Sequence, residues 1–260
     1  MPTKTTKKPQ RWVIKLGTGI LSDSKGQLDL LQFQNLVRQV STLVKRGHEI
    51  ILVSSGAVGA GMGILKMKMR PTRMRELRAC AAIGQPQLMH IYEEHFNRHK
   101  LHVAQMLLTY LDLDSRSLYA NAQKTLGYLL ALKNCVPIIN ENDVVSHQEL
   151  KFGDNDQLSA HVAVMVEADR LIILSNINGL AEHSDGTGKV LPLVETIDAK
   201  IEALAGVTLS QTSVGGMISK IKAAKLTTSR GITMQIANGR TPNVLLKICQ
   251  GQQIGTIFQA

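Results

Sequence analysis

Short, almost wholly apolar segments are the feature that most limits the fold of this chain. Leu171–Leu174 contains no polar residue, and Val136–Ile139 is equally apolar. Strands of this kind are typical of parallel sheets that are covered by helices on both faces. Other segments space their apolar residues as a helix does, such as residues 29–46, which end before Gly47. The sequence therefore predicts an α/β protein.

The predicted strands and helices alternate along the chain, which favours a three-layer αβα sandwich with a central, mainly parallel, doubly wound sheet. The sequence shows neither a repeat nor a linker, and halves at roughly 11–170 and 171–260 would share that sheet. Gly84-Gln85-Pro86 interrupts one helical segment and could separate it into two helices. We expect strands at 12–17, 49–53, 101–108, 136–139, 171–174, 232–237 and 254–258, and helices at 29–46, 73–99, 115–134, 153–167, 217–230 and from about 198.

The composition excludes several classes of protein. With 44% hydrophobic and 19% charged residues, the chain can bury a core and is not a disordered polymer. No run of about 18 apolar residues occurs, so we expect no membrane span. Cys80, Cys135 and Cys249 lie far apart and show no metal-ligand spacing, which favours a reducing compartment and small buried thiols. We therefore expect a cytoplasmic protein.

The net charge of +10 comes largely from two segments. One is a basic tail at residues 1–11, which lacks the apolar region of a signal peptide. The other is Lys66–Arg78, where six basic residues face the single acid Glu76. We interpret this charge first as solvated surface, second as steering of polyanionic substrates, and only third as a nucleic-acid site. Aromatic residues make up only 3% of the chain, so stacking platforms for single strands are scarce.

Polar and glycine-rich segments follow the predicted strands. The carboxyl ends of parallel strands meet at one edge of a sheet, where ligands bind in such folds. Glycines there let backbone N–H groups approach a phosphate, and a nearby lysine can neutralise its charge. Lys15 and Lys220 are so placed, and one on each side of a transferred phosphoryl group would suit in-line displacement. The segments are Lys15–Gly19, Ser54–Gly56, Asn140–Asp143, Gly153–Asp156, Ser175-Asn176 and Val214–Lys220.

Two of these segments combine acids with amides, Asn140-Glu-Asn-Asp143 and Gly153-Asp-Asn-Asp156. Helix capping and loop hydrogen bonds would explain one or two of their residues. Their oxygen atoms would also suit Mg²⁺, although that ion normally enters such sites bound to nucleotide phosphates. His147 lies between the two segments, and we interpret this lone histidine as structural.

Six segments, taken in order, resemble the amino acid kinase family and cover about residues 12–258. The two acidic and amide-rich segments resemble the branch that acts on glutamate, rather than those acting on aspartate, acetylglutamate, carbamate or nucleoside monophosphates. The matching segments are Val13–Thr18, Val53–Ala57, Gln105–Thr109, Ile139–Asp143, Gly153–Ser159, and Gly215–Met217 with Lys220.

The resemblance implies that the γ-carboxylate of L-glutamate attacks the γ-phosphate of ATP, with Mg²⁺ bound to the nucleotide. The product, L-glutamyl 5-phosphate, would begin proline synthesis. Lys15 and Lys220 would stabilise the transferring phosphoryl group, and Asp156 would orient both lysines. Because a carboxylate nucleophile is already ionised near neutral pH, no general base is needed.

The resemblance also assigns the binding residues and divides the domain at 12–260 into a substrate-binding part, about 12–170, and a nucleotide-binding part, about 171–260. It implies dimers or tetramers and feedback inhibition by proline. Many relatives carry a C-terminal RNA-binding-like domain, which we do not expect here. Glutamate would be held by Ser55, Asn140, Asp143, Asp154 and Asn155, and nucleotide by Lys15, Gly17, Ser175, Asn176, Val214, Gly215, Gly216, Met217 and Lys220.

Three departures from the family pattern lie on the nucleotide side. The chain has Ser175-Asn176 where relatives have Thr-Asp, Glu182-His183-Ser184 in place of Asp-Pro-Arg, and Val214 in place of a threonine. The phosphoryl-transfer lysines and the substrate motifs are intact, so we expect an active enzyme. The alternatives are a related kinase with another carboxylate acceptor, a non-catalytic amino-acid sensor on the same fold, and a basic nucleic-acid-binding module.

Overall fold

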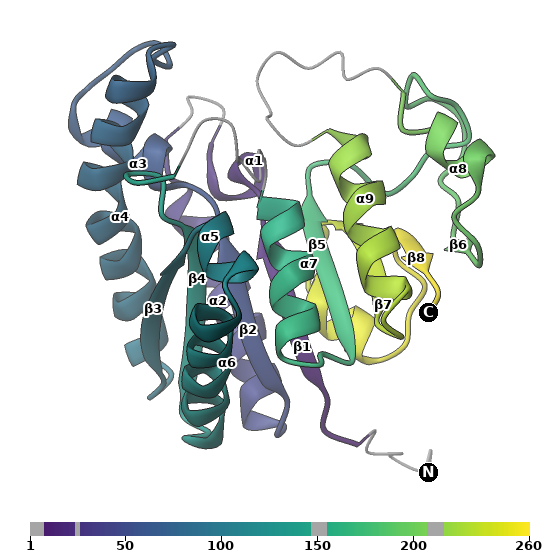
Figure 1. The fold of residues 1–260 in the computed structure, drawn as a ribbon, viewed down its shortest axis with the longest axis horizontal. Helices are drawn as coiled ribbons and strands as arrows, with labels where there is room; N and C mark the ends of the chain where they lie inside the picture. Colours follow the sequence, from purple (N-terminus) through teal and green to yellow (C-terminus); the bar gives the residue numbers. More distant parts are fainter. Residues whose placement is uncertain (1–7, 24–26, 147–154, 207–215) are drawn as a thin grey trace.

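A single eight-stranded sheet forms the centre of the protein (Figure 1). The computed structural model describes residues 8–23, 27–146, 155–206 and 216–260. The strands are β1 (Arg11–Leu16), β2 (Glu49–Ser54), β3 (His102–Leu108), β4 (Cys135–Glu141), β5 (Arg170–Ser175), β6 (Leu193–Val194), β7 (Thr233–Asn238) and β8 (Thr256–Phe258). The helices are α1 (Thr18–Leu21), α2 (Leu30–Lys45), α3 (Ala57–Ile64), α4 (Met74–Asn97), α5 (Tyr110–Asp114), α6 (Arg116–Ala131), α7 (Asn155–Met165), α8 (Ala199–Ala203), α9 (Met217–Thr228) and α10 (Val244–Cys249).

The strand order is β3-β4-β2-β1-β5-β7-β8-β6, and every pairing is parallel except that of β7 with β8. Strand β1 lies between β2 and β5, with Leu16 opposite both Ser54 and Leu174. This register brings the carboxyl ends of the three strands together at one edge of the sheet. The strands of residues 11–141 and 170–258 share this sheet, as expected, and the predicted mainly parallel α/β fold is confirmed.

Alternate residues of the central strands enter two separate cores, one on each face of the sheet. Trp12, Ile14 and Leu16 of β1 pack with α2, α4 and α10, whereas Val13 packs with α6, α7 and α9 on the other face. Burial on both faces explains why these strands are almost entirely apolar. The helices on the two faces complete the three layers of the sandwich (Figure 1).

Helix α4 is continuous, so a division into two helices at Gly84-Gln85-Pro86 is wrong. Proline removes one backbone donor from the helix, but packing against α3 favours the continuous form. A Cβ atom on Gly84 would lie 1.9 Å from the carbonyl oxygen of Ala57, and one on Gly61 would lie 1.9 Å from that of Cys80. The two helices therefore meet backbone to backbone at these glycines.

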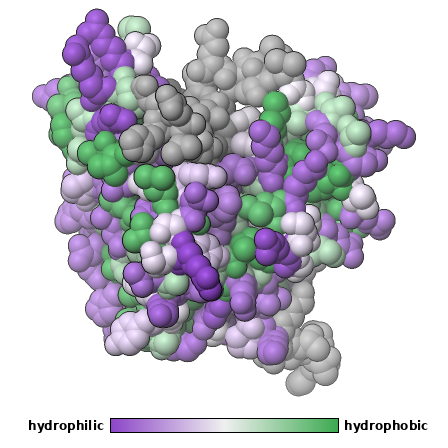
Figure 2. Space-filling model, in the orientation of Figure 1, coloured by the Kyte–Doolittle hydropathy of each residue, from purple (hydrophilic) through white to green (hydrophobic). Residues whose placement is uncertain are grey.

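The surface shows hydrophilic residues spread over the viewed face, with small groups of hydrophobic residues between them (Figure 2). Within the described part of the chain, no helix has the length and apolarity needed to cross a membrane. The three cysteines are free, and Cys80 and Cys135 are buried.

Candidate active site

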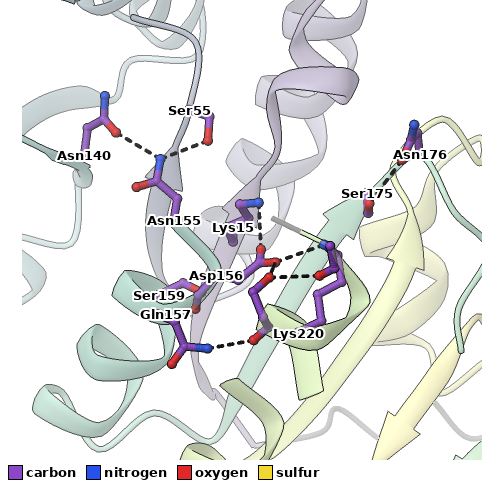
Figure 3. A network of polar contacts seen from close by, with 12 residues as sticks. Lys15, Ser55, Asn140, Asn155, Asp156, Gln157, Ser159, Ser175, Asn176 and Lys220 are labelled. Atoms are coloured by element: carbon purple, nitrogen blue, oxygen red, sulfur yellow. Dashed lines mark hydrogen bonds and ion pairs between the residues drawn. The ribbon is translucent and has the colours of Figure 1, made fainter. Parts of the chain in front are cut away.

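Two lysines and one aspartate form a buried cluster at the carboxyl edge of the sheet. The Nζ atom of Lys15 lies 2.7 Å from Asp156 Oδ1, and the Nζ atom of Lys220 lies 2.9 Å from Asp156 Oδ2 (Figure 3). Lys15 is 6% exposed, Lys220 4% and Asp156 0%. The structure thus brings together the three residues that the family resemblance assigned to phosphoryl transfer.

Each member of this lysine–aspartate cluster comes from a different element. Lys15 is on β1, next to the central pairing with β2 and β5, whereas Asp156 and Lys220 lie in the first turns of α7 and α9. Helices α7 and α9 pack together on one face of the sheet. Two ammonium groups thus meet at one carboxylate in a region of low exposure, where their attraction for a phosphate oxygen would be stronger than in water.

Further hydrogen bonds connect α7 to the start of α9. Ser219 donates from Oγ to Asp156 Oδ2 at 2.9 Å, and Gln157 donates from Nε2 to the carbonyl oxygen of Ser219 at 2.6 Å. The side-chain oxygens of Asp156 thus contact Lys15, Lys220 and Ser219. Ser219 and Gln157 lie within segments predicted to follow the strands or to match the family, but neither was predicted to have a role.

An amide network lies on the other side of Asp156. Asn155 donates from Nδ2 to Ser55 Oγ at 2.9 Å and to Asn140 Oδ1 at 3.0 Å (Figure 3). Asn140 donates in turn from Nδ2 to Gln85 Oε1 at 3.0 Å. Three predicted substrate-binding residues are therefore in direct contact. Gln85 was missed, because its sequence context indicated only a helix interruption.

The turn that carries Ser55 is fixed from both sides. The backbone N–H of Ser55 donates to the carbonyl oxygen of Leu16 at 3.0 Å, and Gly56 adopts φ = +115°, which favours glycine. Ser54 Oγ lies 2.7 Å from the hydroxyl of Tyr92, and burial raises the pKa of this phenol well above its ordinary value. Tyr92 therefore remains neutral and holds the end of β2 in place.

One cavity of about 1090 Å³ joins the cluster to the amide network. Its lining includes Ser55, Asn140, Asp143 and Asn155 on the side of β2 and β4. On the side of β5 and α9 the cavity is lined by Gly17, Ser175, Asn176, Ile177, Leu180, Ala181, Leu204, Gly216 and Met217, with Lys15 and Lys220 also on its wall. The cavity is large enough for two small ligands, and apolar residues line both of its sides, with Val58, Met62 and Leu77 of α3 and α4 opposite those near β5.

The glycines after β1 leave room beside this wall. A Cβ atom on Gly17 would lie 3.4 Å from Lys15 Nζ, and one on Gly19 would lie 3.7 Å from Asn176 Nδ2. Gly17 also donates its backbone N–H to the carbonyl oxygen of Leu174 at 3.3 Å. A ligand with several phosphates could therefore approach the backbone here and contact Lys15 at the same time.

The described residues offer no group of three or more His, Cys, Asp and Glu side chains that could hold a metal ion. Asp156 already contacts both lysines. The donor set near the lysines thus suits a metal that arrives with nucleotide phosphates better than one held by the protein alone. Asp154, Val214 and Gly215 lie outside the described residues, and so does His147.

Comparison with known proteins identifies the family of the chain. The sequence pattern of the amino acid kinase family matches residues 10–238. The chain belongs to this family. A solved structure of UMP kinase from Bacillus anthracis is similar over 97% of both chains, with a TM-score of 0.63 and 14% sequence identity, which supports the fold.

Curated relatives with higher identity are named glutamate 5-kinase. The chain is 47% identical to the protein from Moorella thermoacetica over 96% of this chain and 66% of the relative. It is 43% identical to the protein from Clostridium perfringens over 99% of this chain and 98% of the relative, and 43% identical to that from Picosynechococcus sp. over 97% and 68%. The chain therefore spans about two thirds of some relatives and almost all of another.

Proposed function

We propose that this chain transfers the γ-phosphoryl group of ATP to the γ-carboxylate of L-glutamate. The observation that carries the proposal is the buried Asp156, held between Lys15 and Lys220 on the wall of a cavity that also contains the Asn155–Asn140 network. This arrangement supports an anionic acceptor and a polyphosphate donor meeting at the two lysines. The product would be L-glutamyl 5-phosphate, the first intermediate of proline synthesis.

In the proposed reaction, one oxygen of the γ-carboxylate forms a bond to the γ-phosphorus. The bond between that phosphorus and the oxygen bridging it to the β-phosphate breaks, and ADP leaves with the electron pair. The carboxyl group of glutamate has an ordinary pKa of about 4.3, so the nucleophile is ionised at neutral pH and no side chain needs to remove a proton. Catalysis would then rest on positioning and on electrostatic stabilisation.

The lysines would act on the charge that moves during transfer. Lys15 and Lys220 would contact oxygens of the phosphoryl group or of the leaving phosphate, each replacing part of its contact with Asp156. Asp156 would keep both ammonium groups aimed at the same point, because each of its carboxylate oxygens holds one lysine. The two cations would thus be in place before the substrates arrive.

The binding residues fall on two sides of this centre. We assign glutamate to Ser55, Asn140, Asp143 and Asn155, together with Asp154, and expect the Asp143 carboxylate to bind the ammonium group of the amino acid. Nucleotide would lie along Gly17, Ser175, Asn176, Gly216 and Met217, with Val214 and Gly215. Mg²⁺ carried by the phosphates would neutralise part of their charge.

An acceptor survey tests the proposal. The purified protein is incubated with MgATP and hydroxylamine, which traps acyl phosphates as hydroxamates, and with L-glutamate, L-aspartate or N-acetyl-L-glutamate. We expect hydroxamate and ADP to form fastest with glutamate. A preference for another acid would make the chain a related kinase, and glutamate binding without ADP release would make it a sensor.

We also propose a cytoplasmic homo-oligomer that proline inhibits, on the strength of the family resemblance. Light scattering after gel filtration would give the number of subunits. Titration of L-proline into the hydroxamate assay would show whether it competes with glutamate.

A further inference from the structure

Arg78 is a cavity-lining cation that the proposed reaction does not use. It lies on α4 and shares the cavity with Asn140, Asp143 and Ser146. Its Nη2 atom donates to the carbonyl oxygen of Ser146 at 2.7 Å. Its Nε atom is buried without a hydrogen-bond partner in the described part of the chain. Because a buried donor without a partner is costly, this N–H group is suited to an acceptor that the described residues do not supply.

The lysines and arginines on the cavity wall form two pairs. Lys15 and Lys220 are held by Asp156 at the phosphoryl-transfer centre. Arg70 and Arg78 line the same cavity from the segment that contains the start of α4. Within the described ranges no carboxylate lies within 4 Å of either arginine, so their charges are not neutralised by an ion pair seen there.

Arg78 and the amide network are connected through α4. Gln85 is seven residues after Arg78, which places both side chains on the same face of the helix about 10 Å apart along its axis. Gln85 accepts the hydrogen bond of Asn140, which in turn contacts Asn155 beside the lysine–aspartate cluster. Arg78 and Gln85 therefore both lie on the acceptor side of the cavity, two turns of α4 apart.

An acceptor with two carboxylates is best bound by positively charged side chains at two positions. If the proposed function is correct, the γ-carboxylate of glutamate lies at Lys15 and Lys220, and its α-carboxylate must lie elsewhere. We propose that Arg78 binds the carboxylate of the acceptor that is not phosphorylated. A guanidinium offers planar N–H donors that match a carboxylate, and the Nε atom of Arg78 is a donor without a partner among the described residues.

The test compares L-glutamate with its α-amide, which keeps the ammonium group and the γ-carboxylate but carries no charge on the α-carboxyl group. The variant R78Q is compared with R75Q, which removes the same charge from an exposed residue one turn earlier on α4. We expect R78Q to lower the preference for glutamate over the amide, measured as a ratio of kcat/KM values, by roughly 10- to 150-fold. The KM for ATP and the ratio in R75Q should stay as in the wild type.

A purely structural role for Arg78, through Ser146, would weaken both acceptors equally and leave the ratio unchanged. That result, at an unfolding temperature within a few degrees of the wild type, would overturn the inference. If R78Q does not fold, R78K serves as the test variant. It keeps the positive charge but loses the planar set of N–H donors, so the ratio of kcat/KM values should fall by a smaller factor. A wild-type protein that uses neither acceptor would refute the proposed function itself, and this is seen before any variant is measured.

Discussion

Replacing Asp156 with asparagine would remove the carboxylate that each of two buried lysines contacts. Asn is nearly the same shape, so the change removes a charge without opening a cavity. Lys15 and Lys220 are 6% and 4% exposed, and each lies within 3 Å of the carboxylate. Breaking a buried ion pair by removing one partner costs about 3–5 kcal/mol. For a chain of this size, that corresponds to a fall in Tm of roughly 6–20 °C.

The loss should be measured by urea unfolding of D156N without ligands. The matched control is E202Q, which breaks the exposed pair of Glu202 with Lys225 and should cost less than about 1 kcal/mol. Addition of MgATP should restore part of the stability of D156N, because phosphates would neutralise the lysines that the variant leaves unbalanced. Equal unfolding free energies for D156N and E202Q would refute the view that this carboxylate is what permits two buried lysines.

Four further changes test other parts of the structure. K220A should lower kcat by about 10²-fold or more, the range for one preorganised electrostatic group. D143N should raise the KM for glutamate and leave that for ATP unchanged, because we expect Asp143 to bind the ammonium group. G84A should destabilise the fold by about 1–3 kcal/mol or more, since its methyl group would overlap the backbone of α3. Burial lowers the pKa of His48, so the free energy of unfolding should fall as the pH drops below about 6.5, where the unfolded chain binds the proton more readily.

Each of these has a comparison that could contradict it. Near-normal turnover in K220A would remove that lysine from the proposed role, and an effect of D143N confined to the KM for ATP would move Asp143 to the other substrate. G127A is the control for G84A, because a Cβ atom there meets nothing within 4 Å and should stabilise α6 slightly. A variant H48Q should flatten part of the pH dependence, and an unchanged slope would contradict the assignment.

The sequence predicted the sheet and the convergence of the site because both follow from local patterns. Apolar strands with polar residues at their carboxyl ends must bring those residues together once the sheet is parallel. Lys15 lies near that end of β1 and meets Asp156 and Lys220, which come from the first turns of α7 and α9. Their roles in catalysis, and those of Ser55, Asn140 and Asn155 in substrate binding, stay predictions.

Features that depend on packing between distant segments could not be predicted from the local sequence. Pro86 indicated a break in α4, and only the close approach of α3 shows why the helix continues. Gln85 enters the site because α4 packs against β3 and reaches Asn140 of the neighbouring β4, which no spacing along the chain reveals. The antiparallel direction of β8 and the short helix α10 were also missed, since an apolar run of a few residues encodes neither direction nor type.

The contact of α3 with α4 at two glycines bears on how the site would select an amino acid by its length. A helix held backbone to backbone cannot slide without separating from its neighbour, so Arg78 and Gln85 keep a fixed spacing relative to the serine turn that precedes α3. If Arg78 binds the acceptor as proposed, α4 would set the length of the amino acid that fits. A larger residue at Gly61 or Gly84 would then displace α4 as one piece. It would change the length of amino acid that fits the site without moving Lys15 and Lys220.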